Sequence, residues 1–219
     1  MTSKFNIFSK LLRRKKDLMI CIFLTLAFQL VITTITIKLN KDKQLLGQAT
    51  IINRILQLIF LIFIIFLILK TNLPFFIKQL LFIIFSIFLG LLLSQSLHSL
   101  DPTIIETAAI STLVNFIIMF ILGLIIVYMG YDIGWMGVYL LIILLIIITI
   151  NIIRIFSPAS TMISKSIAVA TIILFSLFII YDTNNILLKY KGKGDCIKGA
   201  LDYYLDIINL FISFLNMNN

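Results

Sequence analysis

Four of the nine acidic residues lie within or beside long apolar runs, where an ionised group is costly. An ionised side chain at the centre of a bilayer costs at least ~2.5 kcal/mol even on insertion scales, and such residues usually face the bundle interior in a functional role. Asp182 closes an apolar run, Glu106 opens another, and Asp202 and Asp206 lie in the last one. We therefore take these four carboxylates as candidates for ion binding and gating.

Spacing places two of these carboxylates on one side of a helix. Asp202 and Asp206 are four residues apart, and Asn209 and Ser213 continue the same face at helical intervals. This face is predicted to be the hydrated one. We read the segment 183–199 as a loop that makes its two flanking helices antiparallel neighbours, so Asp206 is expected to approach Asp182.

Two carboxylates in a partly dehydrated site cannot both ionise at low cost, so the pair should titrate in two coupled steps. Such a pair can sense protons or ligate a cation. The plainer interpretation is that each aspartate caps a helix or pairs with a lysine of the basic loop. Lys70 is the nearest plausible counter-cation for a latch that would break on protonation and open a path.

The composition excludes a soluble globule. The chain has 219 residues, 61% hydrophobic and 12% charged, with a mean hydropathy of +1.16, and its few polar groups cannot cover a water-exposed surface. The net charge of +9 sits in short clusters between apolar runs, which indicates membrane topology rather than nucleic-acid binding. We predict an all-α polytopic membrane protein.

Uncharged stretches mark the expected membrane spans, at roughly 20 apolar residues per crossing. Residues 1–17 are predicted to form a basic cytosolic tail and residues 18–219 a single bundle. Breaks are expected at Pro74, at Asp101 and Pro102, and at Pro158. The predicted spans are Leu18–Ile37, Ile55–Leu69, Gln79–Leu100, Thr107–Tyr131, Ile133–Ile153, Ser166–Tyr181 and Ile207 to the C-terminus.

The distribution of lysine and arginine predicts a cytosolic N-terminus. Twelve of these residues fall on the N-terminal side of the predicted membrane and six on the other, and the more basic side is cytosolic. Six crossings return the chain to that side at Asp182. The segment from Ala200 to Leu215 is then either a seventh span or a re-entrant hairpin.

The chain resembles a known family nearly from end to end, with the specific motif near its C-terminus. Tyr181-Asp182, followed by Tyr204-Leu205-Asp206-Ile207-Ile208-Asn209-Leu210-Phe211, is similar to the terminal signature of the Bax inhibitor-1 superfamily, nearest its Lifeguard and Golgi anti-apoptotic protein branch. Four further segments support the resemblance. They are the stretch 26–34 with Gln29-Leu30 and Thr33, the stretch with Gly90 and Ser94-Gln95-Ser96-Leu97, the sequence Glu106-Thr107-Ala108, and the sequence Tyr131-Asp132 with Gly137.

That resemblance implies a seven-helix bundle with the C-terminal helix at its centre and a pH-sensitive calcium leak across an internal or cytoplasmic membrane. Asp182 and Asp206 match the family's aspartate dyad and would contact the ion. Lys70 stands near the position of a basic latch residue in bacterial relatives, although an ammonium cannot bridge two carboxylates as a guanidinium does. The family's acidic position in the second span has no match here.

Two features could point to other chemistry. Tyr181-Asp182 and Gly192-Lys193-Gly194-Asp195 spell elements of intramembrane aspartyl proteases, but Asp195 is expected in a basic loop rather than inside a helix, so we do not expect an enzyme. Cys21 and Cys196 lack metal-ligand spacing and are read as bulk, with a disulfide not expected.

Two functions therefore remain open. One is a cation leak, with Ca²⁺ and H⁺ as its ions and no resident cofactor. The other is a non-conducting regulator that binds membrane partners, such as apoptosis or protein-quality-control machinery. Golgi or endoplasmic reticulum membrane is the first expectation for location and a bacterial inner membrane the second, while the oligomeric state is undetermined.

Overall fold

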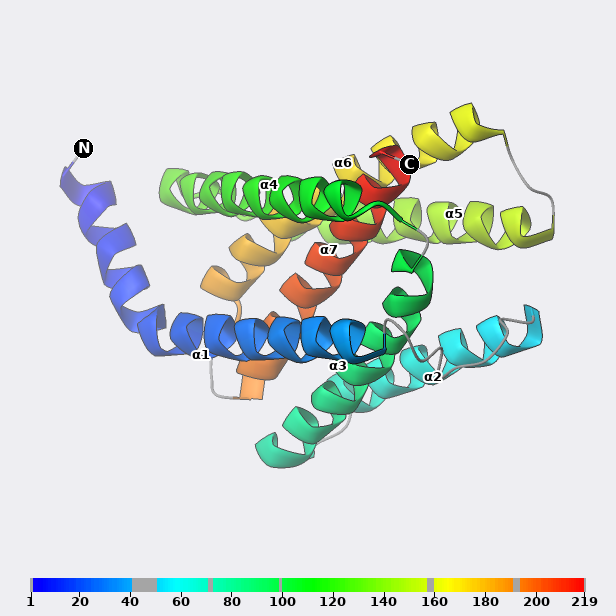
Figure 1. Cartoon of the computed structure of the whole chain (residues 1–219). Helices are drawn as coiled ribbons and strands as arrows, with labels where there is room; N and C mark the ends of the chain where they lie inside the picture. The colour runs from blue at the N-terminus through cyan, green and yellow to red at the C-terminus, as the bar shows by residue number, and fades with distance from the viewer. Residues whose placement is uncertain are drawn as a thin grey trace. The chain divides into compact units, whose positions relative to one another are not determined.

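The computed structural model describes residues 2–40, 51–70, 73–98, 100–156, 160–190 and 194–218. Within them the chain forms seven α-helices, coloured in chain order in Figure 1, and no strand is assigned in this described part. The all-α class is therefore confirmed. The helices are α1 (Thr2–Asn40), α2 (Ile51–Lys70), α3 (Phe75–Leu97), α4 (Pro102–Met129), α5 (Met136–Phe156), α6 (Thr161–Leu188) and α7 (Gly194–Asn218).

Five of these helices are long and apolar enough to cross a membrane, namely α1, α3, α4, α5 and α6. In α2 the apolar stretch within the described residues is shorter, Leu56–Leu69. The last helix, α7, is not among these five. Many large apolar side chains on these five helices are exposed, as expected where lipid is the solvent.

Local sequence signals account for the ends of α4. Asp101 is the N-cap, and its Oδ1 accepts hydrogen bonds from the Thr103 N–H at 2.9 Å and the Thr103 hydroxyl at 2.8 Å, with Pro102 at the first helical position. At the other end Gly130 adopts φ 90°, the left-handed conformation that glycine favours. The break at Asp101 and Pro102 was predicted from these residues and is confirmed.

The predicted loop after Asp182 is wrong over most of its length. Helix α6 continues to Leu188, and α7 already begins at Gly194. Asp182 therefore lies inside a helix, and Asp195 lies in the first turn of α7 rather than in a loop. Hydropathy ended the span at Tyr181 because polar residues follow it, but their side chains are buried by partners that sequence alone does not identify.

The chain divides into two compact units. The first unit contains Met1–Leu18, Asp101–Lys191 and Leu205–Asn219. In it α6 packs against α4 and α5, and Leu140, Ile147 and Leu174 form a buried cluster between α5 and α6. Close approach of α4 and α6 needs Gly123, because a Cβ there would lie 2.6 Å from the Cβ of Thr183.

The second unit contains Met19–Leu100 and Gly192–Tyr204. Its centre is Tyr204, a fully buried residue whose hydroxyl lies 2.5 Å from the Thr33 hydroxyl and whose ring meets Phe82 edge-on at 5.3 Å. Gly90 lets α3 approach α1, since a Cβ there would lie 2.8 Å from the Cβ of Thr36. The start of α7 is thus the buried centre of this unit.

The same unit contains a disulfide that the sequence analysis did not expect. Cys21 on α1 and Cys196 on α7 are joined, with their Cα atoms 5.9 Å apart. A single pair separated by 175 positions gives no local spacing signal. Only the packing of α1 beside the start of α7 brings the two side chains together, so the interpretation of both cysteines as bulk is wrong.

Candidate functional site

The two aspartates of the predicted dyad are both buried in the first unit. Asp182 lies two turns before the end of α6 and is 9% exposed, and Asp206 lies in the middle of α7 and is 3% exposed. Burying a carboxylate is costly unless other polar groups surround it. These two side chains are therefore the strongest candidates for ion chemistry that the first unit contains.

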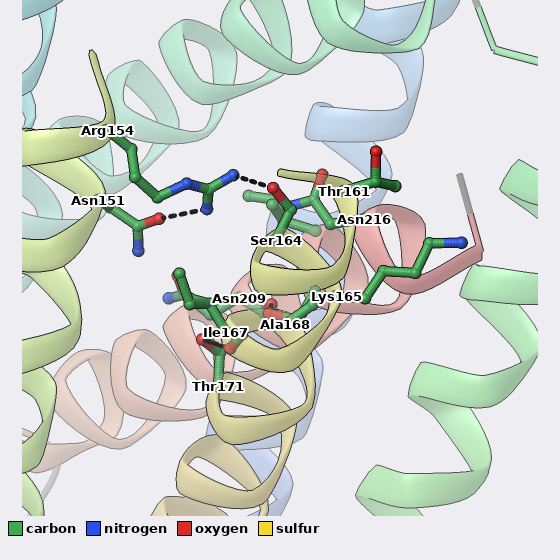
Figure 2. Close-up of a pocket in the computed structure, with 12 residues that line it drawn as sticks. Asn151, Arg154, Thr161, Ser164, Lys165, Ile167, Ala168, Thr171, Asn209 and Asn216 are labelled. Carbon is green, nitrogen blue, oxygen red and sulfur yellow. Dashed lines mark hydrogen bonds between the residues drawn. The ribbon is translucent and has the colours of Figure 1, made fainter. Parts of the chain in front are cut away.

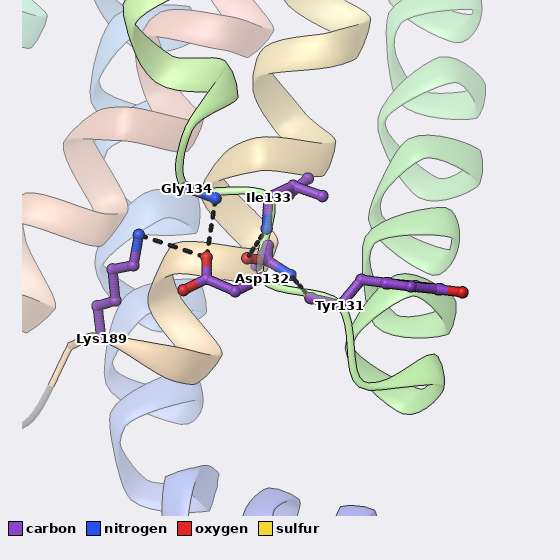
Figure 3. A network of polar contacts seen from close by, with 6 residues as sticks. Tyr131, Asp132, Ile133, Gly134 and Lys189 are labelled. Carbon is purple, nitrogen blue, oxygen red and sulfur yellow. Dashed lines mark hydrogen bonds and ion pairs between the residues drawn. The ribbon is translucent and has the colours of Figure 1, made fainter.

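The residues directly after Asp182 form a buried polar run on α6. Thr183 and Asn184 are 0% exposed and Asn185 is 8% exposed. The Asn184 side chain caps the α4–α5 connection, because its Nδ2 donates to the Tyr131 carbonyl at 2.8 Å and its Oδ1 accepts from the Ile133 N–H at 3.2 Å. Figure 3 shows this network. Sequence reasoning missed this role, although three consecutive polar residues after an apolar run could have signalled it.

An ion pair closes the same end of the unit. Lys189 Nζ lies 3.5 Å from Asp132 Oδ1, and the same oxygen accepts a hydrogen bond from the Gly134 N–H at 2.8 Å. Both charged side chains are about half exposed, so the pair is solvated and of modest strength. Figure 3 shows the lysine reaching across the end of α6 to the carboxylate.

A polar cavity of about 590 Å³ lies at the opposite end of α6, between the end of α5, the start of α6 and the end of α7. The α7 side of its lining includes Asn209, Ser213 and Asn216. With Asp206 these residues recur at intervals of three and four, which is one helix face. Asn209 and Ser213, which were predicted to share this face, both line the cavity, and the hydration of the face stays a prediction.

The beginning of α6 forms the opposite wall of this cavity, with Thr161, Ser164, Lys165 and Thr171 among its lining residues. Because early residues of α6 face late residues of α7 across one cavity, the two helices run antiparallel here, as predicted. Figure 2 shows the lining side chains, with Arg154 and Asn151 contributed by α5.

The other predicted site residues lie elsewhere. Glu106 is exposed in the second turn of α4. Asp202 is half-buried in the part of α7 that belongs to the second unit. Lys70 is the last residue of α2, and its side chain lies outside the described residues. The roles predicted for these three residues stay predictions.

The described residues contain no group of three or more His, Cys, Asp or Glu side chains that could hold a metal ion. A site built on Asp182 and Asp206 would therefore take its remaining oxygens from neutral groups or water. Candidates in the same unit are the hydroxyl of Thr183 and the amides of Asn185 and Asn209.

Comparison with known proteins points to one family. The family described as "Inhibitor of apoptosis-promoting Bax1" matches residues 15–218. An uncharacterized protein of Campylobacter jejuni is 38% identical over 87 residues, 39% of this chain and 36% of that protein. An uncharacterized Helicobacter pylori protein is 42% identical over a stretch of the same length, covering the same shares.

A plant protein is also similar. Protein LIFEGUARD 1 of Arabidopsis thaliana is 35% identical over 88 residues, which are 40% of this chain and 37% of that protein. The chain therefore aligns with little more than a third of the length of each of these relatives. The family match, in contrast, runs nearly from end to end.

Proposed function

Because the chain belongs to the Bax inhibitor-1 family of multi-pass membrane proteins, we propose that it is a pH-sensitive calcium leak gated by Asp182 and Asp206. The proposal is passive transport and includes no catalytic step. Its cellular role would be to modulate calcium homeostasis and cell death. The relatives come from bacteria and from a plant, so they favour neither a bacterial inner membrane nor a Golgi or endoplasmic reticulum membrane.

The burial of two carboxylates within one unit of a membrane protein carries this proposal. Asp182 and Asp206 are 9% and 3% exposed, and intramembrane carboxylates generally mark ion pathways or proton relays. The polar face that begins at Asp206 continues into the cavity at the end of α7. Water in that cavity would give protons access to the buried carboxylate from one side of the unit.

The ligand chemistry suits weak calcium binding. Ca²⁺ takes roughly six to eight oxygen ligands, and two aspartates supply only part of that set. The rest would come from hydroxyls, amides and water. A loosely coordinated ion leaves its site readily, and conduction requires binding weak enough for release. Protonation of either carboxylate would remove charge from the site and change the flux.

Calcium flux from proteoliposomes at two pH values tests the proposal. We expect Asp182→Asn and Asp206→Asn each to change the flux and to flatten its dependence on pH, because a neutral amide cannot be protonated in this range. Asp132→Asn is the matched control. It removes an aspartate of the same unit that is half exposed and paired with Lys189, and we expect it to keep the pH dependence.

Folding must be checked for each variant by size-exclusion chromatography and circular dichroism. A folded wild-type protein without calcium flux would contradict the leak. Flux that keeps its pH response in both dyad variants would leave the leak but remove the gating by these aspartates.

A non-conducting regulator is the second candidate, and the family's description as an inhibitor of apoptosis-promoting Bax1 favours it. In that case the Asp182→Asn and Asp206→Asn variants would keep the cellular effect. Substitutions of exposed apolar residues such as Leu113 or Leu141 would abolish it, because a partner in the membrane must contact lipid-facing side chains.

A further inference from the structure

We propose that the cavity between α5, α6 and α7 binds a phosphate group, supplied either by a lipid headgroup or by a free anion. This inference is independent of calcium conduction. The cavity, of about 590 Å³, falls within the size range of small-molecule sites. Its walls combine amides, hydroxyls and two cationic side chains from the ends of three helices.

Arg154 near the end of α5 is the centre of the proposed site. Its Nη2 donates to the Ser164 hydroxyl at 2.6 Å and its Nη1 to the Asn151 amide oxygen at 3.3 Å. Its Nε is buried and has no hydrogen-bond partner among the described residues. Two neutral acceptors thus orient the guanidinium, as Figure 2 shows, and neither of them offsets its charge.

No carboxylate among the described lining residues balances this charge. The sequence has no acidic side chain between Asp132 and Asp182 or after Asp206. A buried or half-buried cation without a counter-ion is costly, and the ligand that offsets the cost is an anion. The same charge disfavours a divalent cation at this end of the unit.

The remaining lining groups suit the oxygens of a phosphate. Guanidinium groups bind phosphate oxygens in a bidentate geometry, and Asn209, Ser213 and Asn216 add neutral polar groups on the opposite wall. The N-terminal turn of α6 reaches the cavity at Thr161, and helix N-termini favour anions.

The location favours a membrane-interface ligand of this chemistry. Arg154 lies in the last turn of α5, and α6 begins at Thr161, so the cavity opens where two membrane-spanning helices leave the apolar region. Lipid phosphates lie at that depth. Lys165 lines the rim, and its side chain is exposed and points away from the guanidinium in Figure 2, which makes it a secondary contact.

Ligand-dependent thermal stability of the full chain in detergent tests the site. The probes are inorganic phosphate, phosphatidylglycerol as an anionic phosphodiester lipid, and phosphatidylcholine as the neutral-headgroup control. Because charged hydrogen bonds contribute about 1.5–3 kcal/mol, Arg154→Gln should weaken the apparent affinity roughly tenfold or more. The apparent affinity of Arg154→Lys should lie between those of the wild type and Arg154→Gln. Lys165→Gln should weaken the apparent affinity by about threefold or less.

The outcomes separate the two sources of phosphate. Stabilisation of the wild type by phosphatidylglycerol and not by inorganic phosphate assigns a lipid site, and the reverse assigns a free-anion site. Equal stabilisation of wild type and Arg154→Gln by every probe, or no stabilisation of the wild type, overturns the proposal. Size-exclusion profiles and ligand-free melting temperatures show that each variant is folded, and Lys38→Gln, at an exposed position on α1, controls for loss of one positive charge.

Discussion

The Asn184 side chain donates a hydrogen bond to the main-chain carbonyl of Tyr131 over 2.8 Å, which joins the buried polar run of α6 to the α4–α5 connection. The same amide accepts from the Ile133 N–H, so one side chain satisfies two main-chain groups in a turn. The buried segment that contains Asp182 is thereby held at the end of the first unit.

Replacement of Asn184 by Ala should destabilise the protein by about 2–4 kcal/mol. The substitution removes two hydrogen bonds and leaves two main-chain groups without a partner, at about 1–3 kcal/mol for each buried group. Thermal unfolding in detergent measures the loss. Thr149→Ala, which removes only an exposed intrahelical bond to Leu145, should stay within about 0.5 kcal/mol of wild type. Equal melting temperatures for Asn184→Ala and wild type would refute the role of this amide.

Gly123→Ala should destabilise the contact between α4 and α6 by about 1–3 kcal/mol, because the new Cβ would lie 2.6 Å from the Cβ of Thr183 and overpack the interface. The double variant Gly123→Ala with Thr183→Gly moves one Cβ to the other helix. The double variant should lose less stability than the sum of the losses measured for the two single variants. Strictly additive losses in this double-mutant cycle would show that the two residues do not contact.

The disulfide predicts that neither Cys21 nor Cys196 has a free thiol before reduction. Protein denatured without reductant should incorporate no maleimide at Cys21 or Cys196, and it should incorporate two equivalents after reduction. Non-reducing peptide mapping should recover the linked pair. Cys196→Ser should release one reactive thiol at Cys21 and lower the melting temperature, since cross-links between distant positions restrict the unfolded chain. Two reactive thiols in the unreduced wild type would contradict the pairing.

The N-cap of α4 predicts a pH dependence of stability. The hydrogen bonds from Thr103 hold the pKa of Asp101 below its usual value of 3.8. Folding therefore favours the ionised form of the Asp101 side chain. Its contribution is complete above about pH 4 and is lost as the pH falls through the lowered pKa. Asp101→Asn should keep a cap and flatten the melting temperature between pH 5 and pH 3. An unchanged slope in that variant would assign the acid sensitivity to other groups.

Apolar runs and helix breakers determined most of the secondary structure. A chain in lipid must satisfy its backbone polar groups internally, so long apolar runs form helices whatever their neighbours are. Asp101 with Pro102 and Gly130 then define the ends of α4 through local geometry alone. The spacing of Asp206, Asn209 and Ser213 likewise predicted a polar face, which lines the cavity in the structure.

Tertiary structure alone decided where the buried polar groups find partners. Hydropathy scores each residue against an average solvent, so the predicted sixth helix ended before Asp182. In the structure Asn184 bonds to a distant turn, and α6 continues to Leu188. The pairing of Cys21 with Cys196 has the same cause. Each depends on contacts between segments far apart in the chain, and these contacts leave no periodic signal in the sequence.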